Sequence, residues 1–320
     1  MTRHGLILAL CFVFFVSAFS CPAPGASPAA WPAPFNLGSG SSPVFRAAPG
    51  GVLTLTFERD EQLFRSRLEA NGSWSAPVMI ATTTVTGGFT ASDASGASFL
   101  ARTREDGSII VSPNPGNGSQ PSPETVIEGT RGVQTDILHF SIDGSGTKHL
   151  LYARTKAYDT GSDYPGSDVF YRTQAGGLWG TETPIASGMS ISRTFQVPGI
   201  SVTSRGHLHL CSYGDIYHVP GEGNVTRERC PIQDFSMPSR VAAEENDTLH
   251  FVYHSFAEGA PYDQDCLKYV SKGPGGWGRP EIIGAQYAER VPDLFLTPAG
   301  ELFITWEDPD GNLLVTHRLP

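Results

Sequence analysis

Trp31-Pro-Ala-Pro-Phe-Asn-Leu37 is the first of four short segments in which an aliphatic residue follows a tryptophan by six positions, with a proline between them. Self-similar segments at long spacings are typical of chains built from stacked copies of one unit. Strand-like sequence around each segment makes the four-stranded blade of a β-propeller the predicted unit. The other three segments span residues 74–80, 179–185 and 277–283.

Six repeats of about 48 residues fill residues 31–320. In each, a first strand ends at a glycine or Asn-Asp turn, and a second strand follows in which side chains alternate, as in Leu249-His-Phe-Val-Tyr253. A third strand, a glycine turn and the tryptophan strand complete the repeat. The proline of the tryptophan strand cannot donate to a ladder, which predicts an outer edge position. The first strands, with their turns, are predicted at 43–51, 90–96, 136–146, 198–206, 239–247 and 292–300.

The two ends of the chain complement each other. The sixth repeat stops at Pro320 after its third strand, and the strand that it lacks is the tryptophan strand at Trp31–Leu37. Pairing of the two ends would remove an exposed sheet edge and close a ring. We therefore predict an all-β, six-bladed propeller over residues 31–320 whose N-terminal strand completes the last blade. An open two-sheet sandwich is the structural alternative.

The first thirty residues predict export. Residues 1–20 read as a signal peptide, with a polar head, fifteen mostly apolar residues and a cleavage site after Ser20. Cys21 then becomes the first mature residue, where a lipid anchor and simple secretion stay open as alternatives. Residues 21–30 form a Pro/Ala-rich tether. We expect a secreted or otherwise extracytoplasmic protein, attached to a membrane only if Cys21 is lipidated.

Charge and cysteine content restrict the partners. A net charge of −10 argues against nucleic acid, because phosphate binding requires a basic surface. Cys211 and Cys230 fall in one repeat and are the favoured disulfide pair, although buried thiols are nearly as consistent with the sequence. No Cys/His spacing matches a zinc site, so we expect no metal and no cofactor. Histidines of the second strands, His149, His209 and His250, are predicted to be buried between blades.

Ligand-binding candidates come from loops that enter first strands or leave second strands, because these loops meet on one face of a propeller. Arginine binds carboxylates, aspartate and glutamate accept hydrogen bonds from hydroxyls, and tyrosine rings pack on sugar faces. Pairing among these charges is the plainer interpretation. The candidates are Arg131, Asp136, Arg193, Arg240, Arg290, Asp293, His254, Glu307, Tyr158 and Tyr262.

The outer strand, in which tryptophan and proline follow a glycine turn, resembles the repeat of sialidase-like propellers with BNR-type repeats. That family carries Ser-x-Asp-x-Gly-x-x-Trp boxes before the outer strand, and this chain has none there. The resemblance implies a carboxylate-binding arginine triad, for which Arg193, Arg240 and Arg290 are available, and Arg290-Val291-Pro292 is similar to the family's Arg-Ile-Pro element. No tyrosine can be assigned as a nucleophile.

Two functions follow as hypotheses. The first is an exported, monomeric propeller that binds a glycan or envelope polymer on its loop face without catalysis, because the catalytic motifs are missing. The alternative is a divergent sialidase-like glycoside hydrolase or lyase, which the concentration of Arg, Asp and Tyr at loop positions favours. A third reading is a partner-binding protein tethered through Cys21.

Overall fold

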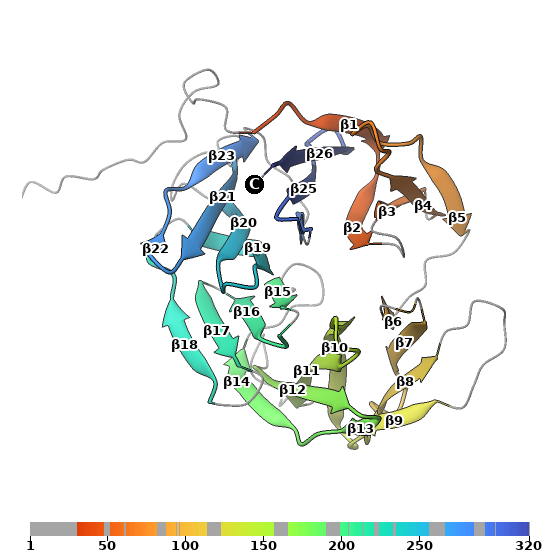
Figure 1. Ribbon diagram of the computed structural model, residues 1–320. Helices are drawn as coiled ribbons and strands as arrows, with labels where there is room; N and C mark the ends of the chain where they lie inside the picture. Colours follow the sequence, from red (N-terminus) through yellow and green to blue (C-terminus); the bar gives the residue numbers. More distant parts are fainter. Residues whose placement is uncertain are drawn as a thin grey trace, which may run out of the picture.

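The fold is a ring of six antiparallel sheets around one axis (Figure 1). The computed structural model describes residues 31–47, 52–60, 62–81, 88–93, 95, 97–113, 123–156, 166–189, 199–203, 205–212, 214–220, 224–232, 235–255, 266–284, 292–297 and 299–319. This confirms the predicted six-bladed propeller. The signal peptide, the tether and Cys21 lie outside the described residues.

In five blades the strands run outward from the axis in chain order, whereas the outermost strand of the sixth blade is the first described strand of the chain. The inner strands are β2 (Ser41–Ala47), β6 (Gly88–Ser92), β10 (Val133–Ile142), β15 (Gly199–Val202), β19 (Phe235–Ala243) and β24 (Asp293–Leu296). The second strands are β3 (Leu53–Arg59), β7 (Ser98–Thr103), β11 (Lys148–Lys156), β16 (Leu208–Ser212), β20 (Leu249–Ser255) and β25 (Leu302–Glu307). The third strands are β4 (Gln62–Arg67), β8 (Ile109–Pro113), β12 (Ser167–Ala175), β17 (Asp215–Val219), β21 (Cys266–Gly273) and β26 (Asn312–Arg318).

The outer strands vary most. They are β5 (Val78–Ala81), β9 (Glu124–Ile127), β13 (Leu178–Trp179) with β14 (Thr183–Met189), β18 (Thr226–Arg229), β22 (Gly276–Trp277) with β23 (Glu281–Gly284), and β1 (Phe35–Ser39). In the fourth blade the outer strand ends at Arg229, two residues before Pro231, whose nitrogen cannot donate to a ladder.

The N-terminal strand closes the ring, as the sequence predicted. β1 pairs with β26 in the sixth blade, with Phe35 opposite Val315 and Asn36 opposite Leu314. Figure 1 shows β1 and β26 side by side in one sheet. The Thr316 hydroxyl also donates to the Pro32 carbonyl at 2.9 Å. The outer edge of that sheet is thereby formed by β1 instead of β26.

Each tryptophan fills the gap between its own blade and the preceding blade. Trp31, of blade six, lies in the buried cluster between blades five and six and meets the Tyr269 ring edge-on, with the ring centroids 5.1 Å apart. Its indole nitrogen donates to Glu281 at 3.2 Å. Trp74 packs in the same way between blades six and one. The tryptophans of the outer strands therefore seal the gaps between neighbouring blades.

The aliphatic residue six positions later packs on the opposite side. Leu37 lies between blades six and one, whereas Trp31 lies between blades five and six. Residues six apart in an unbroken strand share a face. Here the ladder shifts register after the tryptophan, as between Lys272–Trp277 and Tyr269–Glu281, and the extra outer residue reverses the face. One short motif thus seals both sides of its blade.

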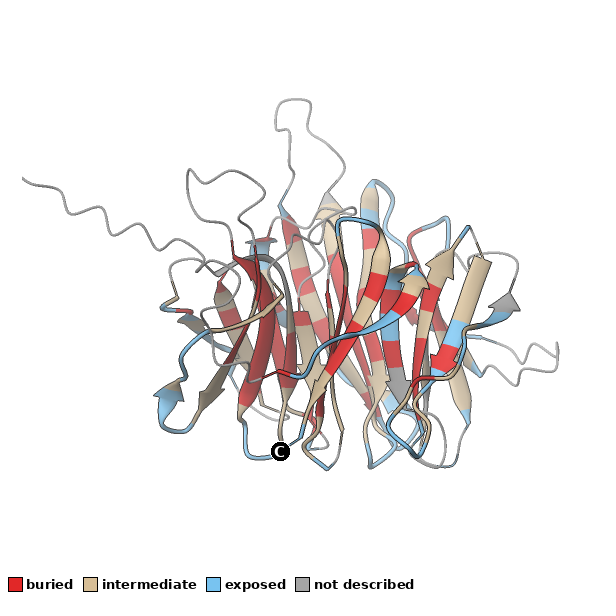
Figure 2. Cartoon of the chain, turned by 90° about the horizontal axis from the view of Figure 1, so that it is seen from above, coloured by how far each residue is buried: buried red, intermediate tan, exposed pale blue. Residues whose placement is uncertain are grey.

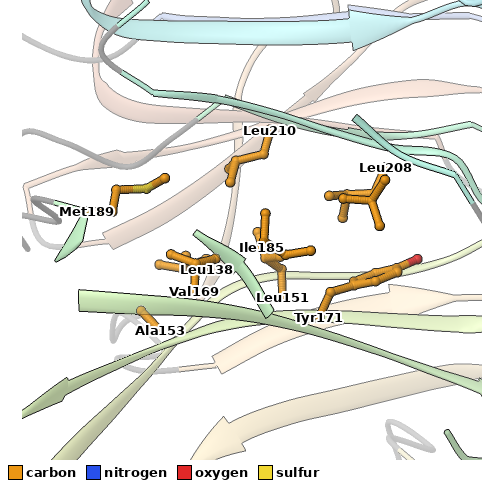
Figure 3. Close-up of a cluster of buried hydrophobic side chains, with 10 residues drawn as sticks. Leu138, Leu151, Ala153, Val169, Tyr171, Ile185, Met189, Leu208 and Leu210 are labelled. Carbon is orange, nitrogen blue, oxygen red and sulfur yellow. The ribbon is translucent and has the colours of Figure 1, made fainter. Parts of the chain in front are cut away.

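Burial is concentrated between blades. Figure 2 shows buried bands across the middle of the strands and exposed segments at the ends. Figure 3 shows one such core, in which Leu151 and Ile185 of blade three face Leu208 and Leu210 of blade four. The described ranges contain no helix long and apolar enough to cross a bilayer.

Truncation of the closing tryptophan should weaken the whole ring. Trp31→Ala removes a nearly buried indole (6% exposed) together with its hydrogen bond to Glu281. We expect the free energy of unfolding to fall by about 3–5 kcal/mol, the usual cost of a buried tryptophan. Urea unfolding followed by tryptophan fluorescence measures it. Leu178→Ala, at a side chain that is 79% exposed, is the control and should change little; equal stability of both variants would contradict closure by Trp31.

Candidate functional site

Strand pairing places one residue of each inner strand at the same height along the axis of the propeller. Each of these residues pairs with the residue twelve positions later in its second strand, as His139 does with Leu151, and Arg240 with Val252. Because the six inner strands surround the axis (Figure 1), the six positions converge there. We call this set the axial ring. Its members are Val44, Phe89, His139, Gly199, Arg240 and Asp293.

Tight turns with a left-handed residue set this level. Gly146, Gly206, Asp247 and Gly300 have φ values of 84°, 77°, 63° and 85°, and each lies seven residues after a member of the ring. A turn of fixed geometry fixes the register of its hairpin. The sequence therefore carried a usable signal for the ring, because each member stands seven residues before the turn residue that ends a predicted first strand.

Asp293 connects three blades at the axis. One carboxylate oxygen, Oδ2, accepts a hydrogen bond from the backbone N–H of Phe45 on β2 at 2.8 Å. The other oxygen, Oδ1, lies 3.7 Å from Nε of Arg240 on β19. Both charged side chains are mostly buried, at 23% exposed for Arg240 and 20% for Asp293. Burial lowers the pKa of Arg240 and the carboxylate of Asp293 opposes that effect, so the pair is held as an ion pair.

His139 adds a neutral imidazole to the ring. Burial lowers its pKa to about 4, and the nearby charges of His149 and Arg240 act in the same direction. Its Nε2 atom is buried and has no hydrogen-bond partner among the described residues. An imidazole nitrogen of this kind can donate to or accept from a ligand hydroxyl, depending on its tautomer.

The other half of the ring is apolar. Val44 on β2 is 43% exposed and Phe89 on β6 is 36% exposed, although both belong to innermost strands. Gly199 on β15 contributes no side chain. The axial ring therefore combines an accessible aromatic face with a buried ion pair and an unpartnered imidazole nitrogen, which is the mixture of apolar wall and few polar groups typical of small-molecule sites.

Among the candidates predicted from sequence, Arg240 and Asp293 lie next to each other as an ion pair at the axis. Asp136 lies on β10, three residues before His139, and accepts a hydrogen bond from Gln134 at 2.6 Å. Arg131 is exposed in the turn before β10, and Glu307 is partly buried at the end of β25. Arg193, Arg290, Tyr158 and Tyr262 lie outside the described residues.

His254 is buried within blade five instead of standing open to a ligand. Its side chain, near the end of β20, is 3% exposed, and burial lowers its pKa to about 4. The imidazole is therefore neutral at pH 7 and forms part of the packing between strands. The strand exit that made it a candidate lies one residue beyond it, at Ser255.

The predicted Cys211–Cys230 disulfide is not formed. Both residues are buried thiols that pack in the core between blades four and five. Cys211 lies on β16 and Cys230 follows β18, with β17 between them. Two strand spacings are about 9.6 Å, beyond the reach of a disulfide. Cys266 is the disulfide-bonded cysteine among the described residues.

The histidines of the second strands are buried and hydrogen-bonded, as predicted. His149 contacts the Tyr171 hydroxyl at 2.5 Å and Asp143 at 3.0 Å, and His250 contacts the Tyr269 hydroxyl at 2.7 Å and Glu244 at 2.9 Å. Each histidine ties the turn of its hairpin to the third strand. Within the described ranges, no group of three or more His, Cys, Asp or Glu residues is placed to hold a metal.

A tyrosine–glutamate pair is present, but within the packing of blade three. The Tyr152 hydroxyl donates to Glu182, which also pairs with Arg154 at 2.9 Å. Tyr152 belongs to the core between blades two and three, and burial raises its pKa. A tyrosine held neutral in this way is a poor nucleophile, so we assign the pair a structural role.

Comparison with known proteins identifies the fold alone. No family model and no curated protein matches the chain. Among solved structures, it is similar to the Penicillium chrysogenum α-L-arabinanase complexed with arabinobiose, at 12% identity over 90% of this chain and 98% of that one, with a TM-score of 0.54. It is also similar to the subtype N10 neuraminidase-like protein of a little yellow-shouldered bat strain, at 10% identity over 90% of this chain and 97% of that one, with a TM-score of 0.53. The NanB sialidase of Streptococcus pneumoniae is similar at 9% identity over 90% of this chain and 70% of that one, with a TM-score of 0.51.

Stability should fall in mild acid. His139, His209 and His254 have pKa values lowered by burial from 6.5 to about 4. Between these pH values the unfolded chain binds protons that the folded protein does not. The stabilisation is therefore complete above about pH 6.5 and is lost as the pH falls towards 4, by up to ~1.4 kcal/mol per pH unit for each histidine.

Urea unfolding between pH 7.5 and pH 4.5 measures this slope. His139→Leu removes one buried imidazole and should make the slope shallower by about 1 kcal/mol per pH unit. His207→Gln, at a partly exposed histidine in a turn, is the matched control. An unchanged slope in His139→Leu would show that His139 does not stay neutral in the folded ring.

Proposed function

We propose that this protein is an exported propeller of the sialidase-like kind that binds carbohydrate or an envelope polymer at the axial ring. The observation that carries the proposal is the composition of that ring. Phe89 offers an accessible aromatic face, Arg240 and Asp293 offer a donor and an acceptor side by side, and His139 offers an unpartnered ring nitrogen. Sugars present apolar C–H faces and hydroxyl edges to matching groups of these two kinds.

Two further observations support this proposal. The solved α-L-arabinanase that the chain resembles holds arabinobiose, a carbohydrate. The first twenty residues have the features of a signal peptide, and export would place the ring among extracellular polymers. A rigid scaffold of packed blades also keeps the axial groups in fixed positions, which lowers the entropy cost of binding.

Binding should depend on the aromatic wall and the imidazole. The full chain is produced in a secreting host, where cleavage after Ser20 is read from the mass of the product, and is applied to glycan and envelope-polymer arrays. For any ligand retained, Phe89→Ala and His139→Ala should each weaken binding about tenfold or more, as for central interface residues. Leu178→Ala, on the outer rim, should bind normally. Absence of retention on every array would reject the proposal.

One observation favours the alternative of a glycoside hydrolase. Asp136 on β10 and Asp293 on β24 belong to the inner strands of blades three and six, which are opposite each other across the ring. Hydrolysis of a glycosidic bond needs two carboxyl groups facing the same linkage. Release of reducing sugar from a retained glycan, lost in both Asp136→Asn and Asp293→Asn, would establish this activity. Binding without release would leave recognition as the function.

A further inference from the structure

We propose that the axial ring selects uncharged, hydroxyl-rich sugars over sugars that carry a carboxylate, an inference that rests on the binding function proposed above. The argument begins with the arginine. Arg240 is the cation of the axial ring, and its Nε already lies 3.7 Å from the Asp293 carboxylate. The charges of the two side chains cancel, so the ring as a whole offers no net positive charge to an anion.

Asp293 is held in this place from a second direction. Its Oδ2 accepts the backbone N–H of Phe45 at 2.8 Å, from the inner strand of the next blade. A hydrogen bond from a backbone donor favours the ionised carboxylate and fixes its position. A ligand carboxylate approaching Arg240 would therefore meet a second, immobile carboxylate within a few ångströms. Like charges so close, in a partly desolvated site, repel each other strongly.

A sugar hydroxyl meets no such conflict. It can accept a hydrogen bond from the guanidinium of Arg240 and donate one to Asp293, whereas a carboxylate can only accept. The neutral imidazole of His139 can engage a further hydroxyl, because its Nε2 lacks a partner among the described residues. The accessible ring of Phe89 and the side chain of Val44 cover the apolar face of the sugar. All members of the ring with side chains then have a role.

This arrangement differs from a site built for acidic sugars, in which unpaired arginine forks bind the carboxylate bidentately. The sequence resemblance implied such a triad, with Arg240 as one member. In the structure, Arg240 has a fixed acidic partner instead. Asp293 is thus the specificity-determining residue, because it converts a cation into a neutral donor–acceptor pair.

The test uses matched oligosaccharide pairs that differ only in a carboxylate, such as galactose and galacturonate, glucose and glucuronate, and mannose and mannuronate oligomers. Calorimetry with the full secreted chain measures both members of every pair at 50 and 500 mM salt. For whichever pair binds, we expect the neutral member to bind about tenfold or more tightly, with an affinity that salt leaves nearly unchanged. Tighter binding of an acidic member, weakened by salt, would overturn the selectivity but leave the binding function intact. Failure of every pair would overturn the selectivity, whereas the binding function is decided separately by retention on the arrays.

Three variants test whether Asp293 is the residue that determines the selectivity. Asp293→Asn keeps an oxygen that can accept the Phe45 N–H but removes the charge, so affinity for the acidic member should rise about tenfold and become salt-dependent. Glu69→Gln makes the same change in net charge at the outer rim, where Glu69 pairs with Arg67, and should alter nothing. The double variant Arg240→Gln/Asp293→Asn removes both charges, so the tighter, salt-dependent binding of the acidic member should be lost again. Unchanged preference in Asp293→Asn, with a normal melting temperature, would reject the role of Asp293.

Discussion

Closure of the sixth blade by the N-terminal strand is the contact on which the rest of the structure depends. β1 is held by its ladder to β26, by the packing of Trp31 and Leu37 on opposite sides of the blade, and by Arg59 of the first blade. The Arg59 guanidinium donates to the carbonyls of Ser39 at 2.6 Å and Leu37 at 3.1 Å. The junction between blades six and one, which this strand seals, is also where Asp293 bonds to Phe45. The position of Asp293 at the axis therefore depends on the same contact between blades six and one that closes the ring.

Register links local sequence to the axial ring. In blades three to six, a left-handed residue in the inner hairpin sets which residue of the first strand stands opposite the second strand at the level of the ring. A shift by one residue would exchange His139 for Phe140 and Arg240 for Val241, both of which are buried between blades. The conformation of a turn at the far end of the hairpin thus decides whether a polar or an apolar side chain reaches the axis.

Fold and chemistry are separable in this protein, and the reason is physical. Blade packing requires large apolar residues between blades, such as Trp31 and Leu37, and turns that accept positive φ values. It makes no demand on the residues that line the axis beyond their size. Propellers at 9–12% identity can therefore share this architecture, and the shared fold does not fix the identity of the axial groups. Function has to be argued from the axial groups themselves.

The sequence by itself determined the ring, the count of six and the closing strand, because these follow from local repeats and from one incomplete repeat. It also placed Arg240 and Asp293 among the ligand candidates. Only the tertiary structure decided that these two neutralise each other, that His139 and Phe89 join them, and that Cys211 and Cys230 stay apart. Such relations depend on which strands become neighbours around the axis, and spacing along a chain does not contain that information.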